Sequence, residues 1–259
     1  MKRNLQKLLA FTMVSLMTLA FTACGSSSKG NGKENSKTYV IATDTTFAPF
    51  EYTDENNKFV GIDVDILAAI AEDQGFEYEL QPLGFDASLT AVQSGEVDGM
   101  IAGMSITDKR RETYDFSDAY YDSGVVVAVA AKSDYTSYED LKGKTVAVKN
   151  GTEGASFAES IEKEYQLKLS YYDDSAYMYQ AVLNGDADAC VEDYPVIGYG
   201  IAQGNDLKMI GEMVKGSSYG FAVLKGQNGE LIEKFNAGLK NIIENGTYDD
   251  IISNYIAEE

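Results

Sequence analysis

The sequence predicts an α/β fold of two similar lobes, each a mainly parallel sheet flanked by helices. Strand-like and helix-like segments alternate from residue 39 onward, which is the pattern of parallel strands joined by helices. The chain also contains an internal copy, because Ala91–Asp98 (AVQSGEVD) matches Ala181–Asp188 (AVLNGDAD). Each copy is typical of a helix end, a glycine that closes the helix and an aspartate that enters a strand. The two halves therefore share one plan.

The first half of the chain supplies most of lobe 1. Short apolar runs indicate strands, and apolar residues three or four apart indicate helices that bury one face. Gly95 stands where a glycine closes the second helix. Asp63 and Asp65 lie near the start of the first helix, and we interpret them as structural caps. The expected strands of this half are residues 39–42, 59–65, 78–83 and 99–102.

The second half repeats this order and adds a C-terminal part. An apolar strand is followed by a helix with apolar residues at four-residue spacing, and two further helices carry apolar stripes that predict core packing. A late strand is expected to return to lobe 1. These segments are residues 124–131, 145–148, 157–165, 218–223, 231–239 and 248–255.

The chain is expected to pass between the lobes twice, near Asp122–Val127 and Gly216–Phe221. Two strands between two bodies form a hinge. These crossings predict a lobe 1 of residues 38–123 and 220–259, and a lobe 2 of residues 124–219.

The N-terminal residues predict export. A basic start is followed by an apolar run at residues 8–21 and by small residues that lead to Cys24. This stretch is too short for a membrane span and is typical of a signal peptide at residues 1–23. The sequence before Cys24 resembles that of bacterial lipoproteins, which predicts lipidation of Cys24, a flexible tether at residues 24–37 and attachment to the outer face of the cell membrane. Ordinary secretion with cleavage nearby is the alternative.

The composition excludes several classes of function. The chain has no histidine, which removes the commonest general base and histidine metal sites, so we expect no catalytic residue and no metal. Cys190 lies between apolar residues and is expected in the core. A net charge of −20 argues against binding to nucleic acid. No cofactor motif is present.

Polar and aromatic residues follow the predicted strands. Ligands of open α/β sheets bind beyond the carboxyl ends of the strands, so these side chains form the predicted ligand site. The set contains cations, carboxylates, hydroxyls and two rings, without a nucleophile–base pair. The predicted ligand-binding residues are Asp44, Phe47, Phe85, Gly103, Ser105, Arg110, Lys149, Thr152, Glu153, Glu192 and Asp193.

An α-amino acid zwitterion matches this chemistry. Arg110 can hold a carboxylate through two parallel hydrogen bonds. Backbone amides near Thr152 and Glu153, at a predicted helix start, add a second anion-binding element. Asp193, the Ser105 hydroxyl and the Gly103 carbonyl can accept from an ammonium. Phe47 and Phe85 can enclose the aliphatic stem and exclude water, and Asp44, Lys149 and Glu192 face the side chain of the ligand.

Six segments of the chain carry a family resemblance. They are ATDTTFAPF at 42–50, GIDVD at 61–65, AGMSITDKR at 102–110, DFS at 115–117, AVKNGT at 147–152 and ENGTY at 244–248. With these segments the sequence, from about Tyr39 to Ile256, resembles the periplasmic amino-acid-binding proteins of ABC importers, which are family 3 of the bacterial solute-binding proteins, and most of all the glutamine-binding type. The resemblance implies a type II periplasmic-binding-protein-like fold that closes on one free L-amino acid and docks on a permease with its ATPase. It implies a monomer without enzymatic activity.

Glutamine is the favoured ligand, because Asp44 can accept from a carboxamide and Lys149 can donate to it. Two positions depart from the glutamine-binding pattern, which has histidine in place of Glu192 and glycine in place of Glu153. Glu192 could neutralise Lys149, so a basic amino acid (arginine, lysine or histidine) is the main alternative, with cystine beside it. An extracytoplasmic dehydratase of the same fold, acting on prephenate or arogenate, is the enzymatic alternative.

Overall fold

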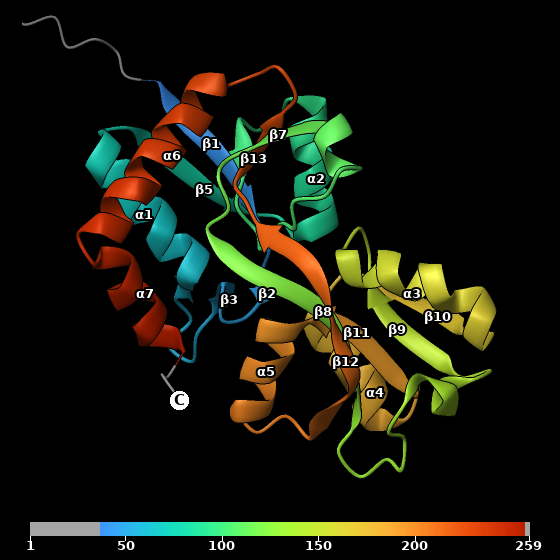
Figure 1. The fold of residues 1–259 in the computed structure, drawn as a ribbon. Coiled ribbons are helices and arrows are strands. Elements are labelled where there is room, and N and C mark those ends of the chain that lie inside the picture. Colours follow the sequence, from blue (N-terminus) through green and yellow to red (C-terminus); the bar gives the residue numbers. More distant parts are fainter. Residues whose placement is uncertain (1–36, 257–259) are drawn as a thin grey trace, which may run out of the picture. The chain divides into compact units, whose positions relative to one another are not determined.

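The computed structural model describes residues 37–256, apart from the side chains of residues 215–217, and this part of the chain is built on two five-stranded mixed sheets flanked by helices (Figure 1). The predicted signal peptide, Cys24 and nearly all of the tether lie outside the described residues. None of the helices in residues 37–256 has the length and apolar character needed to cross a membrane.

The sheet of lobe 1 has the strand order β5-β1-β6-β13-β7. β1 is parallel to β5 and β6, whereas β13 runs antiparallel to both of its neighbours. Helices α1, α6 and α7 share one apolar core with β1, and α2 packs on the other face of the sheet. The bounds are β1 Thr38–Thr43, α1 Ile62–Gln74, β5 Glu77–Pro82, α2 Phe85–Ser94, β6 Gly99–Met100, β7 Tyr114–Phe116, β13 Ala222–Leu224, α6 Gly229–Glu244 and α7 Thr247–Tyr255.

The sheet of lobe 2 has the order β10-β9-β11-β8-β12, in which β9 is parallel to β10 and β11 and the last two strands are antiparallel. Successive residues of β8 alternate between two cores, one with α3 and one with α4 and α5. The bounds are β8 Tyr121–Ala130, β9 Thr145–Lys149, α3 Glu153–Tyr165, β10 Lys168–Tyr172, α4 Ser175–Asn184, β11 Ala189–Asp193, α5 Tyr194–Ala202 and β12 Leu207–Tyr219, with a 3-10 turn, η2, at Tyr138–Leu141.

β8 and β12 leave lobe 1 side by side and enter the sheet of lobe 2 (Figure 1). They are paired antiparallel from Tyr121 opposite Tyr219 to Leu207 opposite Ala130. The lobe boundary predicted at residues 123/124 lies inside β8, and the one predicted at 219/220 lies directly after β12. That the two strands act as a hinge stays a prediction. The single strand expected at 218–223 is two strands, because the chain breaks at Gly220, whose N–H donates to the Met104 carbonyl at 3.0 Å.

The internal copy forms the same local structure in both lobes. Gly95 and Gly185 end α2 and α4 in the left-handed conformation, with φ of 73° and 83°. A carboxylate oxygen of Asp98 then accepts from the N–H of Val40 at 2.9 Å, and one of Asp188 accepts from that of Thr145 at 3.0 Å. Each aspartate therefore ties the turn after its helix to the first parallel strand of its lobe.

The start of α1 differs from the sequence prediction. The strand expected at 59–65 ends at Val60, where β4 (Phe59–Val60) closes a small sheet with β2 (Thr46–Phe47) and β3 (Glu51–Thr53). Gly61, with φ of 143°, turns the chain so that the helix begins at Ile62. The capping role expected for Asp63 is wrong, because its carboxylate accepts from Gly103 and Tyr120 instead.

We predict that Gly61→Ala destabilises the protein far more than Gly75→Ala. A Cβ at Gly61 would lie 2.0 Å from the Phe50 carbonyl oxygen, whereas nothing lies within 4 Å of one at Gly75, which also has positive φ. The Gly75 variant should lose about 1 kcal/mol in urea unfolding, the cost of the left-handed backbone alone, and the Gly61 variant about 3 kcal/mol or more. Equal losses would contradict this account of the turn.

Candidate functional site

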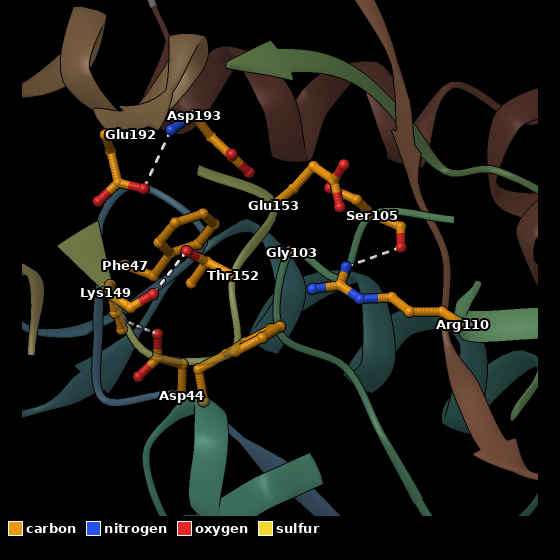
Figure 2. A pocket seen from close by; sticks show the side chains of 11 residues that line it. Asp44, Phe47, Gly103, Ser105, Arg110, Lys149, Thr152, Glu153, Glu192 and Asp193 are labelled. Atoms are coloured by element: carbon orange, nitrogen blue, oxygen red, sulfur yellow. Dashed lines mark hydrogen bonds and ion pairs between the residues drawn. The ribbon is translucent and has the colours of Figure 1, made fainter. Parts of the chain in front are cut away.

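All eleven residues predicted to bind a ligand line one cavity between the two lobes (Figure 2). Most of them come from the carboxyl ends of the parallel strands and from the helix starts beyond them, whereas Phe47 lies in β2. Asp44 follows β1, Gly103 and Ser105 follow β6, and Phe85 opens α2. In lobe 2, Lys149 ends β9, Thr152 and Glu153 begin α3, and Glu192 and Asp193 end β11.

Arg110 reaches the cavity from η1, a 3-10 turn at Arg110–Glu112. One Nη donates to the Ser105 carbonyl at 2.8 Å, and the other donates to the Gly151 carbonyl of lobe 2 at 3.0 Å. The guanidinium carbon lies 5.4 Å from the centre of the Phe85 ring. Burial lowers the pKa of Arg110, and the charge of Glu153 opposes that shift. With five N–H donors and two engaged, the guanidinium keeps donors for an anion.

Asp193 is a buried carboxylate whose charge acts on Arg110, as that of the half-buried Glu153 does more strongly. Its Oδ2 accepts from the Tyr219 hydroxyl at 2.5 Å, and Tyr219 in turn accepts from Ser123 at 3.0 Å. Burial and the charge of Glu192 raise the pKa of Asp193 to about 7, against the lowering effects of Tyr219 and Arg110. A cation bound beside Asp193 would favour the ionised carboxylate.

Lys149 and Asp44 form an ion pair across the two lobes, and both side chains are almost fully buried. Lys149 Nζ also donates to the Ser175 hydroxyl at 3.2 Å and lies 5.5 Å from the centre of the Phe47 ring. Burial alone lowers the pKa of Lys149, but the charges of Asp44 and Glu192 outweigh it and raise the pKa. Lys149 is therefore charged, and its charge is matched by Asp44.

Glu192 does not pair directly with Lys149. One of its carboxylate oxygens accepts from the hydroxyls of Ser175 at 3.0 Å and Tyr179 at 2.9 Å, and the other accepts from the Asp193 N–H at 3.0 Å. Burial raises the pKa of Glu192, and the charge of Lys149 opposes the shift. Ser175 thus stands between the ammonium and this carboxyl group.

The apolar part of the cavity is shaped by Phe47 and Gly103. Gly103 has φ of 51°, and a Cβ there would lie 2.3 Å from the Phe47 ring, so the ring packs on the glycine backbone. Thr152 caps α3 by accepting from the Ala155 N–H at 3.2 Å, and Thr152 and Glu153 at the start of α3 line the cavity. A helix start of this kind attracts an anion.

Sequence reasoning missed three residues of the site, Ser175, Tyr179 and Tyr219. The internal copy carries a signal for two of them. Because Ala181 follows Ala91 by 90 residues, Ser175 is the counterpart of Phe85 at the first position of its helix, and Tyr179 is the counterpart of Leu89. Tyr219 has no counterpart of this kind, since it reaches Asp193 only through the crossing of β12.

The cavity has two chemically different ends. In the view of Figure 2, Arg110 approaches the centre from one side, and the Asp44–Lys149 pair lies on the other. The first end offers guanidinium donors and the α3 amides, with Asp193 beside them. The second offers a compensated ion pair with the Glu192 network. Among the described residues, no three histidine, cysteine, aspartate or glutamate side chains gather as metal ligands.

Comparison with known proteins agrees with this architecture. The family model described as bacterial extracellular solute-binding proteins, family 3, matches residues 39–258. The chain is also similar to an ancestral arginine-binding protein whose structure holds arginine, with 38% sequence identity and a TM-score of 0.80 over 85% of this chain and 98% of that one.

Two proteins of Bacillus subtilis (strain 168) are similar along almost their whole length. The arginine-binding extracellular protein ArtP is 31% identical over 257 residues, which cover 98% of this chain and all of that protein. The ABC transporter glutamine-binding protein GlnH is 30% identical over 276 residues, which cover 98% of this chain and 99% of that protein. Relatives of similar identity therefore carry names for different amino acids.

We predict that Lys149→Met and Asp44→Asn each lower the free energy of unfolding by about 3–5 kcal/mol, because each leaves its partner charged, buried and unpaired. The double variant should lose less than the sum of the two. Urea unfolding measures all three.

The exposed pair Lys240–Glu244, with Nζ and Oε1 3.8 Å apart, is the matched control. Breaking it with Lys240→Met should change stability by about 0.5 kcal/mol at most. A loss no larger than this in the Lys149 variant would show that the buried pair does not stabilise the contact between the lobes.

Proposed function

The chain belongs to family 3 of the bacterial extracellular solute-binding proteins, and from the chemistry of its cavity we propose that it binds a free polar L-amino acid, glutamine first, for an ABC importer. The observation that carries the choice of ligand is the buried Asp44–Lys149 pair at one end of the cavity. At the opposite end of the cavity, Arg110 and Asp193 complement the two charges of a zwitterion, which supports an amino acid as the ligand.

The α-carboxylate and the ammonium of the ligand bind at the Arg110 end. Arg110 keeps N–H donors beyond those to Ser105 and Gly151, and its planar group suits a carboxylate. Asp193 has one oxygen held by Tyr219 and another for the ammonium. The two ligand charges thus meet the two protein charges, which compensates the cost of desolvating all four.

The side chain of the ligand meets the other end of the cavity. Lys149 has three N–H donors, of which Asp44 and Ser175 take two. A carboxamide oxygen can accept the third, and the carboxamide NH2 can donate to Asp44 or Glu192. A neutral side chain uses these groups without bringing an unpaired charge into a buried site. Glutamine provides this carboxamide.

A basic amino acid is the second candidate, and the buried Glu192 is the observation in its favour. An ionised Glu192 would give the side-chain end a net negative charge, since Lys149 and Asp44 cancel. Against this, Glu192 already accepts from Ser175, Tyr179 and the Asp193 backbone. A guanidinium or ammonium would also have to lie beside Lys149, which a neutral amide does not oppose.

In the proposed mechanism, both lobes contact the bound ligand, and this favours the closed form that delivers it. Arg110 and the rings of lobe 1 hold the ligand first, and Asp193 and the start of α3 complete its surroundings from lobe 2, so binding favours the closed form. The closed protein then delivers the amino acid to a permease with its ATPase. We also propose that lipidated Cys24 attaches this non-enzymatic, monomeric receptor to the outer face of the membrane.

We predict that Arg110→Ala weakens glutamine binding by about a hundredfold or more, because the ligand carboxylate loses its charged partner. Cys190→Ser is the control, since this buried thiol does not line the cavity. Calorimetric titration of both variants measures the difference. Unchanged affinity in the Arg110 variant would refute the proposed orientation of the ligand.

We predict that titration of the twenty amino acids finds glutamine the tightest ligand, and that Glu192→Gln lowers the remaining affinity for arginine about tenfold by removing its nearest counter-charge. The affinity for glutamine should fall less. Glu164→Gln, the same charge change on the exposed face of α3, is the control. Arginine, lysine or histidine binding more tightly than glutamine would establish the second candidate.

A further inference from the structure

Two carboxyl groups lie buried beneath the cavity without lining it. Glu51, in β3, and Asp63, in the first turn of α1, have no exposed surface. The two residues are neighbours, since the Asp63 N–H donates to the carbonyl of Phe50, the residue before Glu51, at 2.9 Å, and each carboxyl group shifts the pKa of the other. No N–H or O–H group of the described residues donates to either carboxyl oxygen of Glu51 or to the Oδ1 of Asp63. Three buried acceptors without a donor require an explanation.

Asp63 has the surroundings of an anion. Its Oδ2 accepts from the Gly103 N–H and from the Tyr120 hydroxyl, both at 2.8 Å. It also lies at the start of α1, where the helix dipole favours negative charge. Glu51 accepts from no N–H or O–H group of the described residues. Two adjacent carboxylates without counter-charge cannot both ionise in a buried site.

We propose that Glu51 is a positioning residue of the ligand site: its neutral carboxyl group donates a hydrogen bond to Oδ1 of Asp63, and the Asp63 carboxylate holds the Gly103 loop. One proton between the two groups supplies the missing donor for Asp63 and removes the charge of Glu51. No second donor is needed, because a neutral carboxyl oxygen is far less costly to bury than an ionised one.

The ionisation of both groups supports this arrangement. Burial raises the pKa of Asp63 to about 7, and the hydrogen bonds from Gly103, Tyr120 and Glu51 oppose the shift. Burial, and then the charges of Asp63 and Asp44, raise the pKa of Glu51 well above its ordinary value, and Lys149 opposes this only weakly. Besides Asp44 and Lys149, the titratable groups that act on the pair are Tyr120 and Tyr248, and both are neutral phenols at neutral pH.

Glu51 and Asp63 each contact a residue that lines the cavity. Asp63 holds the Gly103 N–H, and the Phe47 ring packs directly on Gly103. Glu51 is also the strand partner of Phe47 in the β2–β3 hairpin. The shared proton therefore fixes the positions of two parts of the site. These are the Gly103 loop, whose carbonyl accepts from the ligand ammonium, and the Phe47 ring, which covers the ligand stem.

Infrared difference spectroscopy tests the shared proton without any ligand. A neutral carboxylic acid has a C=O stretching band well separated from that of a carboxylate. At neutral pH we expect such a band in the wild type, its loss in Glu51→Gln, and its retention in Glu192→Gln, the control for the other buried glutamate. No difference between wild type and Glu51→Gln would overturn the proposal.

Calorimetry tests the positioning role, and this part rests on the proposed binding of glutamine. Glu51→Leu, which cannot donate to Asp63, should weaken binding about tenfold or more. Glu51→Gln, which can donate from its amide, should recover most of that loss, whereas Glu55→Leu, in the exposed turn between β3 and β4, should match the wild type. Equal losses for the leucine and glutamine variants would refute the role of the hydrogen bond.

The infrared and the calorimetric experiment test different claims, so a negative result in one does not decide the other. A wild type that binds no free amino acid would contradict the proposed function, and the infrared bands would still decide whether Glu51 is neutral. Should Glu51→Leu not fold, Glu51→Gln still tests the role, because it keeps the volume and an N–H donor: a tenfold loss of glutamine affinity in this variant would refute the role of the hydrogen bond.

Discussion

The ion pair between Asp44 and Lys149 is the interaction on which the contact between the lobes depends. Its partners are 105 residues apart in the chain and belong to different sheets, yet both are almost fully buried. A charge removed from water requires a partner, so neither residue is stable in this environment without the other. The hydrogen bonds of the neighbouring groups follow from this constraint. The Ser175 hydroxyl accepts from the Lys149 ammonium, and the hydroxyls of Ser175 and Tyr179 donate to Glu192, which does not contact Lys149 directly.

The same constraint divides the cavity into two ends with separate tasks. In the proposed orientation of the ligand, the Arg110 end meets the charges that every free α-amino acid carries, which would make this end general. The Lys149 end, where Asp44 and Lys149 match each other in charge, would then select for what the ligand side chain can donate and accept.

The duplicated plan of the lobes explains why these groups meet at all. Parallel strands place their carboxyl ends at one edge of a sheet, and the two lobes present these edges to each other. Equivalent positions in the two halves carry different groups: Gly103, which follows β6, has a bare backbone, whereas Asp193, at the end of β11, has a carboxylate. In lobe 1, the Glu51–Asp63 pair supports the Gly103 loop, because Asp63 accepts from the Gly103 N–H.

The sequence by itself determined the alternation of strands and helices, the two-lobed α/β fold and the eleven side chains of the cavity, because periodicity, closing glycines and strand-end residues are local signals. It did not determine that β12 would stop at Tyr219, that Asp63 would serve Gly103 rather than cap a helix, or that Lys149 would pair with Asp44 and not with Glu192. Those outcomes join residues tens to hundreds of positions apart. Only the tertiary structure decides them, because the partner of a buried polar group is set by which side chains the packed sheets bring within hydrogen-bond distance.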